Sequence, residues 1–415
     1  MGISMKDREV LRELASELAE IAALPEQEER MRLHRALNGL RPERPVVMID
    51  QIAWHEMNVD DELTVQSEDA FCQWIETGIR RTLYQWKHMP GDMVVEPFLT
   101  LPKSLHNTGF GIRADEEVAV MDPDNQVKGH LYHDQLSDES DIEKIKMPTV
   151  ELDAEKTAEN YERASEIFDG ILPVKMIGRI GSFSPWDRLA EWRGAEAAVF
   201  DLAMRPDYVH ALMRRITDAS LHALDQLEAQ GILGPYQGTV HCTGAWCDEL
   251  AATQLDNESA KARDCWTFAM AQIFSTVSPA MHAEFEIPYI SEYAERFGML
   301  YYGCCEPLDD RIDVVRKLPN LRKISMSPWV NVERGAESIG RDFVFSRKPS
   351  PAFLARDCWL PDEVERDLRE TAEACKRHGC PLEFILKDIS TVHYEPQRLW
   401  EWNDIAMRVA MDFAG

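Results

Sequence analysis

Eight times along this 415-residue chain, a short apolar run is followed by a stretch whose apolar residues have helical spacing. Short apolar runs bounded by polar residues, Gly or Pro are typical of strands buried on both faces, as parallel strands are. Eight alternations of strand and helix predict a (β/α)8 barrel. The expected strands are Val46–Asp50, Met93–Glu96, Val174–Gly178, Thr239–Cys242, Met299–Gly303, Arg322–Ser327, Phe343–Ser346 and Glu383–Asp388.

Helical patterns precede and separate these runs. Over residues 5–38, Leu11, Leu14 and Leu18 are spaced for one helix face, and Pro25 separates this helix from a second one. Residues 1–42 are therefore predicted to form an N-terminal helical extension. Further helices are expected at Ala195–Met204, Tyr208–Gln230 and Pro361–Arg377.

One connection, residues 97–173, is too long for a plain crossover between two strands. Within it, Val118–Met121 and Val127–Tyr132 are predicted to pair as a β-hairpin closed by residues 122–125, and Glu151–Phe168 has a helical pattern. We expect this segment to be an insertion over the barrel mouth after the second strand. Since the chain has neither an internal repeat nor a low-complexity linker, residues 1–415 are predicted to be a single domain.

The charge of the chain argues against a polyanionic partner. It carries 73 Asp and Glu against 45 Lys and Arg, a net charge of −28, whereas nucleic-acid binding requires cations that neutralise phosphates. Nine cysteines scattered over a long chain fit the reduced thiols of a cytoplasm better than a disulfide framework. Because no segment approaches the roughly 18 apolar residues of a membrane span, we expect a cytoplasmic protein that binds neither nucleic acid nor membrane.

In a barrel of this kind, the active site is built at the C-terminal ends of the strands. Two of the residues there have structural alternatives: Asp187 is also suited to cap a helix, and Lys387 with Asp388 to form a buried ion pair. The residues nominated by this rule are Asp50, Trp54, His55, Glu96, Arg179, Trp186, Asp187, His241, Cys242, Trp246, Tyr302, Cys304, Cys305, Glu306, Ser325, Ser327, Trp329, Arg347, Lys348, Lys387, Asp388 and Ser390.

Thiol, imidazole and carboxyl groups occur together at two of these strand ends. Cys304, Cys305 and Glu306 follow the fifth expected strand, and His241 ends the fourth, which would be its neighbour in a sequentially ordered barrel. Zinc binds such mixtures of ligands, so these four residues are the predicted metal ligands. The alternative is that the cysteines and the histidine are ordinary buried core residues.

Several stretches of the chain resemble the uroporphyrinogen decarboxylase superfamily. They are Arg30–Arg44, Gly178–Ala203, Arg205–Val209 and Val277–Tyr289, and the resemblance extends roughly from Arg30 to the C-terminus. It implies a (β/α)8 barrel of one of two branches, the porphyrinogen decarboxylases or the zinc-dependent methyltransferases that work with cobalamin-carrying proteins.

The motifs that separate these branches place the chain nearer the methyltransferases. Asp50–Trp54 stands where the decarboxylases have an arginine-bearing segment that holds carboxylates. Tyr302-Gly303-Cys304 is similar to the His-x-Cys motif of the methyltransferases, with Tyr302 in place of the histidine, and Ser390 stands where they have a further cysteine.

The resemblance implies a methyltransferase that moves a methyl group from a small methylated compound, such as a methoxylated aromatic, to a corrinoid on a separate protein. A metal-assisted decarboxylase or lyase acting on a non-porphyrin carboxylic acid is the alternative, and a non-catalytic corrinoid- or ligand-binding protein is a third reading. The expected catalytic residues are Glu306, His241 and Asp388. The expected substrate-binding residues are Trp54, Glu96, Trp186, Trp246, Tyr302 and Lys387.

Overall fold

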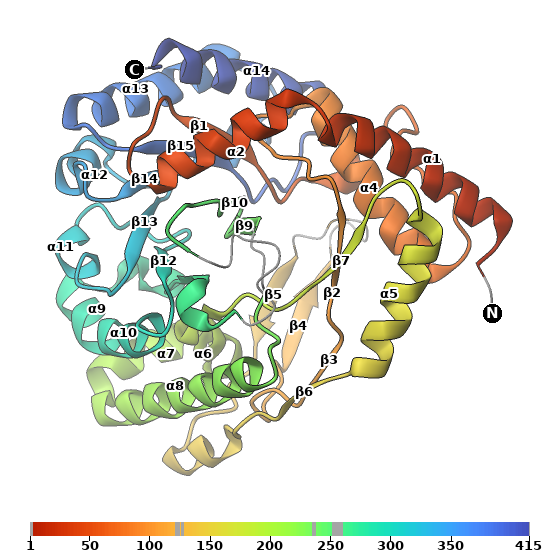
Figure 1. The fold of residues 1–415 in the computed structure, drawn as a ribbon. Helices are drawn as coiled ribbons and strands as arrows, with labels where there is room; N and C mark the ends of the chain where they lie inside the picture. Colours follow the sequence, from red (N-terminus) through yellow and green to blue (C-terminus); the bar gives the residue numbers. More distant parts are fainter. Residues whose placement is uncertain (1–2, 121–124, 126–127, 235–237, 251–259, 415) are drawn as a thin grey trace.

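The computed structural model describes residues 3–120, 125, 128–234, 238–250 and 260–414. Short strands surround a common centre, and most helices pack outside them (Figure 1). The strands are β1 (Val46–Ile49), β2 (Leu99–Pro102), β3 (Leu105–Asn107), β4 (Glu116–Ala119), β5 (Gly129–Tyr132), β6 (Val150–Leu152), β7 (Val174–Ile177), β8 (Ser182–Phe183), β9 (Thr239–Val240), β10 (Thr243–Gly244), β11 (Trp266–Ala269), β12 (Met299–Tyr302), β13 (Leu321–Met326), β14 (Val344–Arg347) and β15 (Leu382–Leu386).

The helices alternate with these strands over most of the chain. The α-helices are α1 (Met5–Ala22), α2 (Pro25–Asn38), α3 (Trp54–Met57), α4 (Ala70–His88), α5 (Ala154–Phe168), α6 (Pro185–Arg193), α7 (Ala195–Met204), α8 (Pro206–Ala229), α9 (Pro279–Phe285), α10 (Ile287–Ala294), α11 (Ile312–Val315), α12 (Val332–Ile339), α13 (Pro361–His378) and α14 (Gln397–Asp412). Short 3-10 helices lie at Glu139–Lys144, Ala262–Asp264, Gln272–Thr276 and Pro351–Phe353.

The wall of the ring is a parallel sheet. Its strands neighbour one another in the order β1, β15, β14, β13, β12, β11 and β8, and each pair in this series is parallel. A separate parallel pair, β2 with β7, forms the remaining wall at the right of Figure 1. The predicted α/β class with parallel strands is confirmed, and the arrangement is barrel-like.

Each buried strand has two apolar faces, as the continuous apolar runs predict. On β12, Met299 and Tyr301 pack in a central cluster with residues of β1, β14 and β15, whereas Leu300 and Tyr302 pack in the outer cluster beneath the helices. The central cluster also includes Val240 of the β9–β10 hairpin, which lies in the middle of the ring in Figure 1. The hairpin therefore lies inside the ring of strands.

One of the eight expected strands does not form, and a second forms but does not belong to the wall. Residues 93–96 are not a strand, because side chains of α2 bind this backbone instead: Gln27 Oε1 accepts from Val95 N at 2.8 Å and Arg30 donates to Met93 O at 2.8 Å. β2, a few residues later, takes the wall position.

The expected strand Thr239–Cys242 is shorter than predicted and belongs to an antiparallel hairpin inside the ring. The wall strand next to β12 is β11, which the sequence pattern did not reveal. The prediction that the strand bearing His241 neighbours the Met299 strand is therefore wrong. The hairpin nevertheless brings His241 close to Cys304, which follows β12.

The expected hairpin of the long connection forms between β4 and β5, which pair antiparallel. Its turn, residues 122–125, lies outside the described residues except for Asn125. Asn125 Nδ2 donates to Ser390 O at 3.3 Å, in the loop after β15. This contact places Asn125 beside the loop that follows β15.

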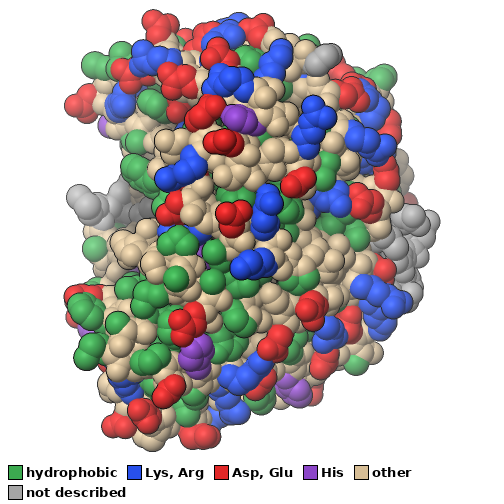
Figure 2. All heavy atoms as spheres, turned by 90° about the vertical axis from the view of Figure 1, so that its left-hand side faces the viewer, with side chains coloured by type: hydrophobic (Ala, Val, Ile, Leu, Met, Phe, Trp, Pro, Cys, Tyr) green, Lys and Arg blue, Asp and Glu red, His purple; other side chains and the backbone are tan. Residues whose placement is uncertain are grey.

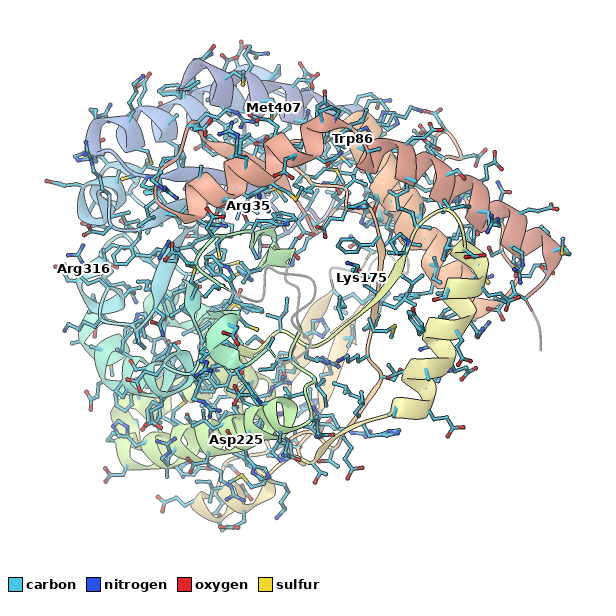
Figure 3. All side chains as sticks on the ribbon, viewed as in Figure 1. Arg35, Trp86, Lys175, Asp225, Arg316 and Met407 are labelled. Carbon is cyan, nitrogen blue, oxygen red and sulfur yellow. The ribbon has the colours of Figure 1, made fainter. Side chains whose placement is uncertain are left out.

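The outer surface carries both signs of charge. Asp225 on α8 and Arg316 after α11 lie at the outer rim (Figure 3). Basic and acidic side chains are interspersed over the face shown in Figure 2, and hydrophobic side chains gather toward its lower left. Among the described helices, none has both the length and the apolar character needed to cross a membrane.

Candidate functional site

The loop after β12 begins with a turn that requires glycine. Gly303 has φ of +92°, and a Cβ atom there would lie 2.5 Å from Leu308 and 3.1 Å from Ser325. The next residue, Cys304, is held from both sides of its backbone. Ser325 Oγ donates to its carbonyl oxygen at 2.7 Å, and its N–H donates to Glu306 Oε2 at 2.9 Å. The fold therefore fixes the position of the Cys304 thiol.

Cys304 is the centre of a cluster of polar side chains at the ends of β12 and β15. Lys387 Nζ donates to Cys304 Sγ at 3.1 Å, and Cys305 Sγ lies 3.6 Å from the same sulfur atom. Cys304 and Lys387 are each only 4% exposed. The exposed residue Asp388 has its Oδ2 3.2 Å from Lys387 Nζ and 3.7 Å from Cys305 Sγ.

The electrostatics of this cluster favour a thiolate on Cys304. The hydrogen bond from Cys305, together with His241 and Lys387, outweighs burial and holds the pKa of Cys304 well below its ordinary value. The same hydrogen bond raises the pKa of Cys305. Burial lowers the pKa of Lys387, but the charges of Cys304 and Asp388 outweigh burial and raise it above its ordinary value. At neutral pH the pair is therefore a buried thiolate and ammonium, the state in which a cysteine is reactive.

His241 approaches this cluster from the hairpin inside the ring. Its backbone φ is +43°, an uncommon conformation for a residue other than glycine, and such strain occurs often at functional sites. Its ring stacks on Phe268 at 4.9 Å and meets Tyr301 edge-on at 5.1 Å. Burial lowers the pKa of His241, so the imidazole is neutral at pH 7. Its Nε2 atom is buried and has no hydrogen-bond partner among the described residues.

A second lysine enters the ring from the end of β14. Lys348 Nζ donates to the hydroxyl of Tyr301, which is 2.5 Å from Ser346 Oγ. All three side chains are buried, and burial lowers the pKa of Lys348 to about 8 and raises that of Tyr301.

A fully buried ion pair lies in the same interior. Lys323 Nζ and Glu383 Oε2 are 2.9 Å apart, and Thr243 Oγ1 donates to the same carboxylate at 2.7 Å. Sequence analysis missed this pair as well as Tyr301 and Ser346. Polar residues at alternate positions of apolar strands, such as Lys323 and Ser325, were the available signal.

Glu306 lies behind the loop and holds it. Its two carboxylate oxygens accept from Cys304 N at 2.9 Å and from Ala271 N at 3.0 Å. The side chain is fully buried, and burial together with the charge of Cys304 raises its pKa to about 7. Glu306 therefore acts on the site through the position of Cys304.

Two other expected site residues lie on the outer side of the wall. Tyr302 faces the helices, and its hydroxyl is 2.6 Å from His282 Nε2. Trp186 is fully buried against Phe274, with ring centroids 4.5 Å apart. Asp187 does not cap α6 but accepts hydrogen bonds from Gln272. The assignment of Tyr302 and Trp186 to substrate binding stays a prediction that their placement does not support.

Three of the expected substrate-binding residues, Trp54, Glu96 and Trp246, have their contacts elsewhere in the structure. Trp54 packs on Tyr84 of α4. Trp246 packs on His34 of α2, the helix that leads into the N-terminal end of β1. Glu96 lines a cavity of about 350 Å³ between α1, α4, α5 and β2. The structure thus brings together the predicted residues Cys304, Cys305, His241, Lys387 and Asp388. The predicted residues Glu306 and Ser325 hold the backbone of Cys304, and Lys348 faces the same interior.

The predicted zinc ligands have suitable chemistry but not a suitable arrangement. Within the described part of the chain, no group of three or more His, Cys, Asp or Glu side chains could hold a metal ion. Both oxygens of Glu306 accept backbone hydrogen bonds, and the ammonium of Lys387 occupies one side of Cys304 Sγ. The arrangement of these four residues therefore does not fit zinc.

Comparison with known proteins gives a likeness of fold. No protein family and no curated protein matches the sequence. Among solved structures, a methyltransferase from Methanosarcina mazei superposes with a TM-score of 0.51 at 15% identity. The superposition covers 93% of this chain and 99% of that chain. At this identity, the comparison establishes a shared fold over nearly the whole length of both proteins.

Proposed function

We propose that this chain is a methyltransferase that passes a methyl group from a small methylated compound, such as a methoxylated aromatic, to a corrinoid carried by a separate protein. The observation that carries the proposal is the 3.1 Å contact between the buried side chains of Lys387 and Cys304 at the C-terminal ends of the strands, where the electrostatics favour an ammonium and a thiolate. The fold likeness to a methyltransferase and the stretches that resemble the superfamily support it.

In such a transfer, negative charge develops on the heteroatom that loses its methyl group. Buried donors already in place stabilise that charge more than water does, because they need not reorganise. An ammonium group has three N–H donors. Lys387 directs one N–H to Cys304 and lies 3.2 Å from Asp388. Among the described residues, the third N–H has no further acceptor and is directed in our proposal to the heteroatom of the substrate.

The remaining residues keep Lys387 charged and in place. The thiolate of Cys304 stabilises the ammonium, and Glu306 fixes the backbone of Cys304. The chemistry supplied by the partner is that of a Co(I) corrinoid, a strong nucleophile toward methyl carbon. The chain itself thus supplies binding, orientation and electrostatic stabilisation.

The proposal is tested by mixing purified protein with cob(I)alamin and a panel of methoxylated benzoates, methylamines and dimethyl sulfide. Formation of methylcobalamin, measured by its absorbance, is the expected result. Cys304→Ala should lower the rate about 100- to 1000-fold, the usual effect of losing a preorganised electrostatic group. Cys358→Ala, which changes an exposed cysteine, is the matched control and should leave the rate unchanged. A panel without any methylcobalamin would refute the proposal.

A lyase or decarboxylase acting on a small carboxylic acid is the second candidate. The observation in its favour is that two buried ammonium groups, Lys348 and Lys387, face one interior, where they could hold a carboxylate. Release of labelled carbon dioxide from carboxyl-labelled acids, without methylcobalamin formation, would select this function over methyl transfer.

A further inference from the structure

Lys348 is anchored at its backbone and directed into the ring. Its N–H donates to Met326 O at 2.8 Å, which continues the β13–β14 ladder beyond the end of β14. The side chain is 3% exposed, and its ammonium donates to the Tyr301 hydroxyl, which in turn contacts Ser346. A buried chain of three polar groups therefore ends in an ammonium that interacts electrostatically with Cys304.

This ammonium differs from its two buried neighbours. Lys323 is paired with Glu383, and Lys387 is paired with Cys304 and Asp388. Among the described residues, no carboxylate forms an ion pair with Lys348. Its charge still interacts at longer range with nearby titratable groups, which are Glu383, Cys304, Cys242, His241 and Lys387. A buried charge without a partner is costly, so such a group is retained where a ligand or a reaction uses it.

We propose that Lys348, linked through Tyr301 to Ser346, donates a proton to the leaving oxygen of the methyl donor, so that the donor is an O-methyl compound such as an aryl methyl ether. This inference rests on the proposed methyl transfer. In the step, the bond between methyl carbon and oxygen breaks and its electron pair stays on oxygen. The methyl carbon bonds to the nucleophile that the partner protein carries, which supplies both electrons of the new bond. An N–H proton of Lys348 moves to the oxygen. The products on this side are a phenol and the neutral amine of Lys348, which solvent reprotonates.

The acidity of Lys348 suits this step. A phenol has a pKa of about 10, so an ammonium whose pKa is lowered to about 8 by burial is the stronger acid. Proton transfer to a phenolate is then favourable, and Lys348 is still mostly protonated at pH 7. A lysine with its ordinary pKa of 10.5 would gain nothing from the transfer.

A binding experiment tests the role without requiring turnover. The probe is 4-nitrophenol, whose phenolate form absorbs in the visible, titrated into the wild type, Lys348→Gln and Lys348→Arg near pH 7. Lys348→Gln should weaken phenolate binding at least 10-fold, and Lys348→Arg should retain most of it because the cation remains. Lys376→Gln, at an exposed lysine of α13, is the matched control and should bind like the wild type. Equal binding by Lys348→Gln and the wild type would overturn the inference.

A turnover experiment then separates proton donation from a merely structural role. Methylcobalamin formation is measured with methoxybenzenes whose phenols differ in pKa. The rate of Lys348→Gln should fall about 100-fold with poor leaving groups and little with nitro-substituted ones. The wild-type rate is expected to fall as the pH rises through about 8, where Lys348 loses its proton, and this fall should be absent in Lys348→Gln. The same dependence on leaving group in both proteins would overturn the inference. Transfer from methylamines but not from O-methyl donors would overturn it while leaving methyl transfer intact.

Discussion

Replacing Lys387 by Met removes the ammonium that binds the Cys304 thiolate but keeps an apolar side chain of similar length. Hydrogen bonds to charged groups contribute about 1.5–3 kcal/mol, and one pKa unit corresponds to about 1.4 kcal/mol. Since the hydrogen bond of 3.1 Å favours the thiolate, its loss should raise the pKa of Cys304 by about one to two units. Cys305 and His241 remain, so the pKa should still lie below its ordinary value.

The pKa is measured from the rate at which Cys304 reacts with iodoacetamide between pH 4 and 9, followed by mass spectrometry of the peptide. Thiolate absorbance near 240 nm provides a second readout, and Cys304→Ser identifies the part of it that belongs to Cys304. In Lys387→Met the onset of reaction should move to higher pH, while Lys376→Met, at an exposed position, should behave like the wild type. An unchanged onset in Lys387→Met would show that the ammonium does not hold the thiolate.

Three further predictions concern stability. Lys323→Met leaves the buried carboxylate of Glu383 unpaired and should lower the free energy of unfolding, measured by urea denaturation, by about 3–5 kcal/mol. The double variant Lys323→Met, Glu383→Leu should lose far less stability. Equal losses in the two variants would contradict the pairing. The folded pKa of Glu306 is raised from 4.5 to about 7, so the folded state binds its proton more tightly and stability falls as pH rises from about 4.5 to 7. Glu306→Gln should reduce this fall in the free energy of unfolding by up to about 3 kcal/mol. If the stability of the variant depended on pH as steeply as that of the wild type, the prediction would be refuted. Gly303→Ala should cost about 1–3 kcal/mol, because φ is +92° and the new Cβ meets Leu308; an unchanged melting temperature would contradict this.

The strands that sequence analysis located are those whose apolar run stands alone between polar residues. It could not distinguish Thr239–Cys242 from β11, because both are short runs with β-branched or aromatic residues in one long connection. Which of two such runs joins the wall depends on contacts distant in sequence, such as the pairing of β11 with β12. The prediction of a strand at residues 93–96 was wrong for a related reason, because side chains of α2, distant in sequence, bind this backbone.

For the site, the rule that strand ends carry function located Cys304, Lys387 and Asp388. The rule does not say which way a side chain points. Tyr301 and Tyr302 are adjacent, yet one enters the ring and the other faces the helices, because successive residues of a strand alternate between its faces. The polar interior was missed because its residues lie within apolar strands and their partners are far apart in the sequence.

The role of the Cys304–Lys387 pair in methyl transfer is tested by the single-turnover rate of methylcobalamin formation in the wild type, Cys304→Ser and Lys387→Met with one accepted donor. We expect a rapid transfer in the wild type and a rate lower by about 100-fold or more in each variant, since each variant lacks one member of the charged pair. Removing both should cost little more than removing one, because the two act as a unit. Transfer at the wild-type rate in either variant would show that the Cys304–Lys387 pair does not take part in methyl transfer.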